Sequence, residues 1–136
     1  AELNGWPGPA HVLEFRVELD LREDQVARTQ EIFEAMQAAA IKAGARLIAA
    51  ERALDQAFET RTVYTQSLAV LLEEAATARG ALRYVHLSRH LAMDAVLTDD
   101  QRARYDRLRG YANDPCAQVP EGHNAAMWRR HNGCDG

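Results

Sequence analysis

The sequence predicts an all-α protein: a long antiparallel helical hairpin with short flanking helices, four to five helices in total. Two observations favour this fold. Prolines stand only near the ends of the chain, at positions 7, 9, 115 and 120. Between them, apolar residues recur at alternating steps of three and four, which is the period of amphipathic helices. At 136 residues the chain fits one domain, with an irregular start at 1–10, a helical body at 11–110 and an irregular tail at 111–136.

The first elements of the body are a short segment and a long helix. We expect a short helix over 11–20, although the alternation of apolar residues from Leu13 to Leu19 is also typical of a strand. The first long helix should run over about 22–58, with Gly44 permitting a close helix contact at a cost of about 1 kcal/mol against alanine. Its heptad-like seam consists of Val26, Thr29, Phe33, Met36, Ala40, Ala43, Leu47, Ala50, Leu54 and Ala57.

A second long helix should span about 66–96, after a break at 59–64 that makes the pair an antiparallel hairpin. A last short helix should follow to about Arg109, because Thr98 and Gln101 form a capping box and Gly110 is a stop signal. The seam of the second long helix consists of Leu68, Leu71, Ala75, Ala78, Leu82, Val85, Arg89, Ala92 and Val96. Apolar residues off this seam, such as Leu72, Leu87, Leu91 and Leu97, lead us to expect a homodimer.

Composition and motifs exclude several classes of function. The formal net charge of −4 gives no basic surface of the kind that binds nucleic acid. The chain lacks an apolar run long enough for a membrane helix. It also lacks a nucleophile–base constellation and a phosphate-binding loop, so we do not expect an enzyme. The start at Ala1 is compatible with a signal or a membrane tether upstream.

The tail holds both cysteines, Cys116 and Cys134. In an exported protein, the pair suggests a disulfide worth about 3 kcal/mol in a chain-entropy description. In the cytosol, the same residues would be free thiols or metal ligands. The tail also repeats His123, Met127 and His131 at steps of four, which is a second candidate metal site. A disulfide-closed flap that packs on the hairpin is the plainer interpretation, and we prefer it.

The strongest candidate for a functional site lies near the end of the second long helix. His86 and His90 are four residues apart and therefore share a helix face, with Met93 and Asp94 one turn further along. Imidazole, thioether and carboxylate groups together suit a late transition metal. The plainer interpretation is a pair of solvated histidines beside a core methionine and a surface carboxylate.

Two similar segments begin the first long helix and the last short one: Leu21-Arg22-Glu23-Asp24-Gln25 and Leu97-Thr98-Asp99-Asp100-Gln101. Paired LTxxQ motifs around a long hairpin resemble the Spy/CpxP-like periplasmic superfamily, over roughly residues 11–110. That superfamily includes stress chaperones and the periplasmic sensors of nickel and cobalt resistance. The second motif matches fully, whereas the first has arginine in place of threonine.

The resemblance is closest to the metal-sensor branch and implies a ligand set. That branch places a histidine and a methionine just before the second motif, where His90 and Met93 stand here. It also uses a glutamate on the first long helix, for which Glu34 is the nearest candidate, and N-terminal histidines, of which only His11 is present. His86 would supply a replacement ligand for the missing N-terminal histidine.

The resemblance implies a protein of the Gram-negative periplasm, with a possible tether to the inner membrane, that senses or binds a heavy metal. The ligand set suits a divalent nickel, cobalt, zinc or copper ion. Metal binding would shift the conformation of the hairpin, and a membrane-bound anti-sigma factor or sensor kinase would respond to that shift. The alternative is a chaperone-like protein that binds unfolded clients without metal.

Overall fold

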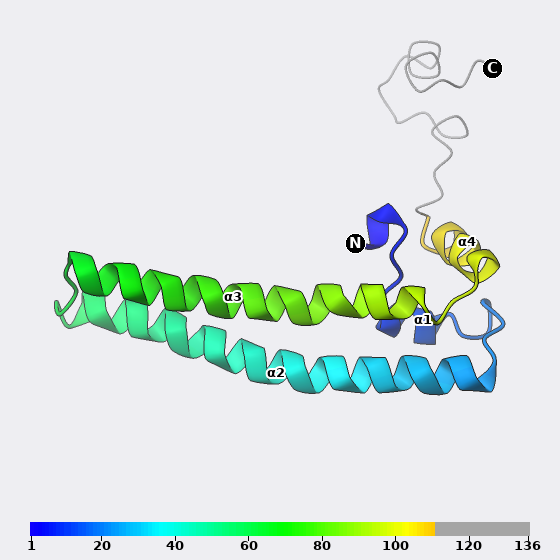
Figure 1. Ribbon diagram of the computed structural model, residues 1–136, viewed down its shortest axis with the longest axis horizontal. Coiled ribbons are helices and arrows are strands. Elements are labelled where there is room, and N and C mark those ends of the chain that lie inside the picture. Colours follow the sequence, from blue (N-terminus) through cyan, green and yellow to red (C-terminus); the bar gives the residue numbers. More distant parts are fainter. Residues whose placement is uncertain (111–136) are drawn as a thin grey trace, which may run out of the picture.

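The computed structural model describes residues 1–110, and all the regular structure in that range is helical. A 3₁₀-helix η1 (Glu2–Asn4) and a short α1 (Pro9–Glu14) precede the two long helices, α2 (Glu23–Glu59) and α3 (Thr65–Asp94). A short α4 (Asp99–Leu108) follows them. Helices α2 and α3 lie side by side as an antiparallel hairpin, with α1 and α4 gathered at its open end (Figure 1). The predicted all-α hairpin is confirmed.

The long helices begin and end within about two residues of the predicted bounds, but the segment 11–20 differs. Helix α1 starts earlier, at Pro9, and ends at Glu14. Residues 15–20 form turns, and Asp20 has a left-handed backbone with φ of 51°. The prediction of a helix to residue 20 is therefore wrong, because the turns direct the fully buried Leu19 into the core before the chain reverses into α2. The irregular start predicted at 1–10 is also interrupted, by η1 and by the first turn of α1.

The predicted seam between the long helices is confirmed. Every residue of both seams is buried or partly buried, and the buried ones are Thr29, Ala43, Ala75 and Ala78. The close helix contact predicted at Gly44 is wrong, because a Cβ built at Gly44 would meet no atom within 4 Å. The same holds for Gly80 on α3. Alanine, rather than glycine, therefore sets the spacing of the two helices.

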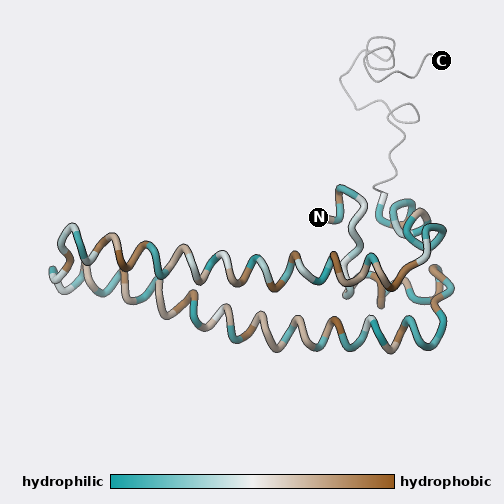
Figure 2. The backbone as a smooth tube through the Cα atoms, in the orientation of Figure 1, coloured by the Kyte–Doolittle hydropathy of each residue, from teal (hydrophilic) through white to brown (hydrophobic). Residues whose placement is uncertain are grey.

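The main core lies at the open end of the hairpin. There, Phe15 packs edge-on against Tyr105 with ring centroids 6.4 Å apart. Helix α4 is largely hydrophilic (Figure 2), yet Tyr105 on its inner side is fully buried. Leu97, one of the four off-seam leucines behind the expectation of a homodimer, is part of this same core. The buried cluster draws on every α-helix and the turns between them: Val12, Leu19, Ile32, Met93, Leu97 and Tyr105.

The glutamines of the two similar segments meet inside this end of the molecule. Gln25 donates from Nε2 to Oε1 of Gln101 over 2.7 Å, and Gln101 donates in return over 2.9 Å. Each glutamine oxygen also accepts from the backbone N–H of the residue that caps its own helix, Arg22 or Thr98. Thr98 completes its capping box by accepting from the amide of Gln101. The arginine at position 22 instead pairs with Asp24, so only one of the two boxes is complete.

The described part of the molecule has two regions. The hook end comprises residues 1–35 and 86–110, and the arm comprises residues 36–85. The first eight residues, which cross the hook end ahead of α1, are called the strap (Figure 1).

Candidate functional site

The two helix histidines of the predicted metal site lie on α3 in the hook end, and both bond a backbone carbonyl. Nδ1 of His86 lies 3.1 Å from the carbonyl oxygen of Leu82, and Nδ1 of His90 lies 2.9 Å from that of Trp6. A carbonyl oxygen can only accept, so Nδ1 carries the hydrogen in each ring. In the neutral imidazole, Nε2 then holds the lone pair. This is the tautomer that metal-binding histidines adopt when a carbonyl orients them.

His11 also bonds an oxygen atom through Nδ1, but it lies on α1 and its partner is a side chain. Its Nδ1 lies 2.9 Å from Oε1 of Glu2, so the carboxylate holds this ring as the carbonyls hold the other two. Glu2 also accepts a hydrogen bond from the hydroxyl of Tyr105 and one from the guanidinium of Arg109, each over 3.0 Å. Burial, with the hydrogen bond and negative charge of Glu2, raises the pKa of the Tyr105 phenol far above its usual range. Glu2 therefore joins the strap to α1 and α4.

The sequence interpretation missed Glu2, which is the centre of this network. The only available signal was an acidic residue followed nine positions later by a histidine, and such a pattern predicts no contact. Gly8 explains how the strap fits. A Cβ at that position would lie 2.7 Å from Oε1 of Glu2 and 3.2 Å from Cε1 of His90. A side chain at position 8 would thus press on both the Glu2 carboxylate and the His90 ring and displace one of them.

Three other predicted ligands are placed differently from the expectation. Met93 is fully buried and packs in the main core. Glu34 is exposed on α2, where it accepts a hydrogen bond from Gln30 one turn earlier. Asp94, the carboxylate beside the histidines, accepts from Arg102 over 2.7 Å. The structure therefore gives each of these side chains a packing or polar partner of its own.

Residues 1–110 contain no group of three or more His, Cys, Asp or Glu side chains placed to share one metal ion. The five-residue set of His11, Glu34, His86, His90 and Met93 is thus not assembled in this conformation. His86 and His90 are one turn apart on α3, each bonded to a different carbonyl. The second candidate site, at His123, Met127 and His131, and the predicted Cys116–Cys134 disulfide lie outside the described residues.

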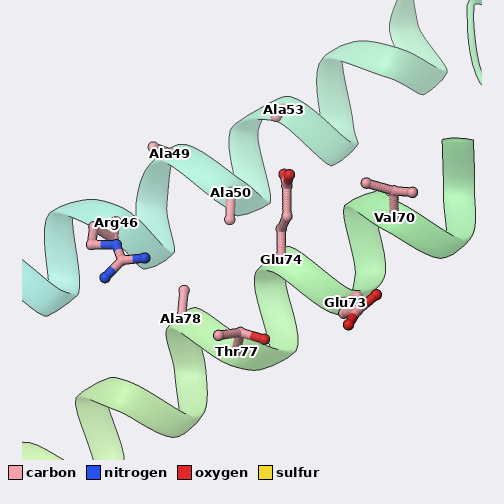
Figure 3. Close-up of a pocket in the computed structure, with 9 residues that line it drawn as sticks. All are labelled: Arg46, Ala49, Ala50, Ala53, Val70, Glu73, Glu74, Thr77 and Ala78. Atoms are coloured by element: carbon pink, nitrogen blue, oxygen red, sulfur yellow. The ribbon is translucent and has the colours of Figure 1, made fainter.

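The arm offers a surface of another kind. An open groove of about 640 Å³ lies between α2 and α3. In Figure 3, Glu74 extends from α3 toward α2, and Arg46 extends from α2 toward α3. The groove is lined by small and charged residues: Arg46, Ala49, Ala50, Ala53, Val70, Glu73, Glu74, Thr77 and Ala78. Large apolar side chains also stand exposed on the arm, namely Ile41, Ile48, Phe58, Tyr64, Val70, Leu72 and Tyr84.

Comparison with known proteins gives no matching family model, no matching curated protein and no matching solved structure. The likeness to the Spy/CpxP-like superfamily therefore stays a prediction that rests on the two five-residue segments and the hairpin. Among the described helices, none combines the length and the apolar character needed to cross a membrane.

Proposed function

We propose that the chain binds a divalent transition metal ion through His86 and His90 as part of a metal response in the bacterial envelope. The proposal rests on the tautomer of the two imidazole rings. Each donates its Nδ1–H to a backbone carbonyl, which leaves the lone pair of each ring on Nε2, and the two residues are one turn apart on α3. Two histidines four residues apart on a helix are a recurrent way to hold zinc.

The chemistry of the pair restricts the ion. Neutral imidazole suits zinc, copper and nickel, and cobalt falls in the same series of divalent ions. Of the five predicted ligands, the two helix histidines are the ones proposed to bind the ion. The proposal leaves Met93 in the core and Glu34 with Gln30, because moving either would sacrifice packing or a hydrogen bond. His11 stays with Glu2.

The hydrogen bond between His90 and Trp6 suggests how binding could be transmitted. His90 belongs to the proposed metal site and Trp6 belongs to the strap. A metal ion on the His90 ring would therefore affect the hydrogen bond that holds the strap to α3. The strap in turn reaches α4 through Glu2. Metal would thus favour one arrangement of the hook end, and a membrane-bound partner, an anti-sigma factor or a sensor kinase, would respond to that population. The periplasm, with a possible tether to the inner membrane, is the compartment that this proposal requires.

Calorimetric titration of the purified full chain with Zn²⁺ and Ni²⁺ tests the proposal. We expect saturable binding that His86→Ala or His90→Ala weakens by at least about tenfold, as expected for loss of a ligand. His123→Ala, in the tail, is the matched control and should leave the affinity within about twofold. The proposal fails if both helix variants bind as tightly as the parent chain. Loss of binding in the control would assign the metal to the tail instead.

A second function is favoured by the arm, namely chaperone-like binding of unfolded proteins without metal. The exposed apolar side chains on α2 and α3, next to a groove with charged walls, provide the mixed surface that non-native chains contact. Suppression of client aggregation by the metal-free protein tests it. Ile41→Ser with Ile48→Ser, both on the exposed side of α2, should reduce the suppression, whereas His86→Ala should not. An effect of His86→Ala alone would argue against this second function.

A further inference from the structure

The groove between α2 and α3 continues toward the turn of the hairpin. Beyond the part of about 640 Å³ at the middle of the arm lies a second hollow of about 480 Å³, which Thr62 and Gln66 line near the turn. Val70 and Glu74 line both hollows, so the two form one continuous surface, called the arm groove. Along α3 it extends from Gln66 to Ala78, which is about 18 Å at the rise of a helix. The arm groove is therefore long enough for about three turns of another helix.

Small side chains form the floor of the arm groove on α2. Ala49, Ala50 and Ala53 line it there, and Ala50 points toward α3 in Figure 3. Each alanine leaves space that a larger apolar side chain can fill. A third helix with leucine-sized residues at steps of three and four fits such a floor, because large and small side chains then alternate across the contact.

The charged residues of the arm groove have no partners within residues 1–110, unlike a charged pair elsewhere on the arm. Arg46, Glu73 and Glu74 form no hydrogen bond or ion pair in that range. By contrast, Arg79, which is about 140° around α3 from Glu74, joins Glu51 across the hairpin over 2.7 Å. The arm groove thus has two carboxylates on its α3 wall and a guanidinium on its α2 wall. These walls complement a helix that is basic on one flank and acidic on the other.

We propose that the arm groove binds an amphipathic helix of a partner protein. The apolar face of this helix packs on the alanine floor, its basic flank faces Glu73 and Glu74, and its acidic flank faces Arg46. In this mode of recognition, apolar anchors at steps of three and four enter a groove. The opposite charges of the two walls select the direction of the helix, because turning it end for end exchanges its flanks. The binding requires neither the histidine pair nor a metal ion, so it is independent of the proposed metal function.

Fluorescence anisotropy of a labelled peptide, titrated with the full chain in chelator, tests the inference. The probe is a synthetic peptide of about 15 residues, long enough to be helical. It has leucines at steps of three and four, lysines on one flank and glutamates on the other. The comparison peptide has two central residues replaced by proline and cannot form the helix. We expect saturable binding of the first peptide and at least about tenfold weaker binding of the second.

Variants of the chain locate the binding site. Ala49→Glu places a carboxylate on the α2 wall, against the acidic flank of the peptide, and should weaken binding at least about tenfold. Ala76→Glu makes the same change at an exposed alanine of α3 outside the arm groove, and should leave the affinity within about twofold. Glu74→Gln should weaken binding about two- to fivefold, as for an exposed ion pair. Glu59→Gln, the same change of charge outside the arm groove, should not. Circular dichroism should confirm that every variant is folded.

Four outcomes would overturn the inference. Absence of binding by the helical peptide would mean that the arm groove is not a helix site. Equal binding of both peptides would assign the arm groove to non-native chains, as in the chaperone-like function. Equal affinities of Ala49→Glu and Ala76→Glu would place the peptide elsewhere on the molecule. A parent chain that sediments as a dimer in chelator, and that Ala49→Glu converts to a monomer, would mean that a second copy covers the arm groove.

Discussion

The hook end and the arm are built from the same two long helices, but they are stabilised in different ways. The hook end buries six large side chains in one cluster and encloses a reciprocal pair of glutamine amides. In the arm, only the alanines Ala43, Ala75 and Ala78 are buried, while larger apolar residues such as Ile41 and Tyr84 stand exposed. The comparison indicates that a regular heptad pattern suffices to pair two helices. Fixed positioning of functional side chains requires the additional packing found only at the hook end.

The largest effect should come from truncating the core of the hook end. Met93→Ala should lower the free energy of unfolding by about 2–5 kcal/mol, the usual range for a fully buried large aliphatic side chain. Denaturant unfolding measures this. A second variant at this position, Met93→Leu, tests the role of the residue. If Met93 were a metal ligand, Met93→Leu would lose affinity for the ion, whereas a purely packing role predicts unchanged affinity and a cost below about 1.5 kcal/mol.

The next largest effect should come from the buried amide pair. Gln101→Ala removes one glutamine and leaves one N–H of Gln25 without its acceptor, while the Gln25 oxygen keeps its bond from the Arg22 amide. An unsatisfied buried polar group costs about 1–3 kcal/mol. Chemical denaturation of Gln25→Ala, Gln101→Ala and the double variant should show strong coupling, with the double variant far less destabilised than the sum. Additive effects would mean that the two amides act independently.

A smaller effect, confined to high pH, should come from Tyr105. Its folded-state pKa is raised by burial and by the hydrogen bond and charge of Glu2. A raised pKa favours the protonated phenol in the folded state, so this contribution is complete below the unfolded pKa of about 10 and declines as pH rises above it. Thermal melts across the alkaline range should show a falling stability that Tyr105→Phe reduces. An identical decline in both proteins would assign the effect to other groups.

The smallest effect should come from the arm and should have the opposite sign. Gly44 and Gly80 are helical, and a Cβ at either position meets no atom within 4 Å. Replacing each by alanine should raise the free energy of unfolding by about 0.5–1 kcal/mol, since glycine is the costlier residue inside a helix. Melting temperature measures the gain. A loss of stability would instead mean that a second molecule packs closely on these positions.

The elements that local pattern determines could be predicted from the sequence. The seams of α2 and α3 follow the helical period, and the Thr98 capping box marks the start of α4. The candidate site was harder to predict because its contacts join distant residues. Glu2 accepts hydrogen bonds from Tyr105 and Arg109, which lie more than 100 positions later in the sequence. No periodic pattern predicts such contacts. The sequence position of Met93 was compatible with two roles, metal ligand and core residue. One turn after His90, it also lies on the side of α3 that faces the core.

The contacts of the hook end also determine when the molecule can be completed during synthesis. The hairpin closes around a loop of only a few residues between Glu59 and Thr65, so the arm can form as soon as α3 leaves the ribosome. Gln25 must wait for Gln101, 76 residues later, and Glu2 must wait for Arg109, 107 residues later. Contacts at such separation form late because closing a long loop costs entropy before any contact repays it. The strap is therefore made before the arm but is among the last parts to settle, and a chain cut short before α4 would have an arm but no closed hook.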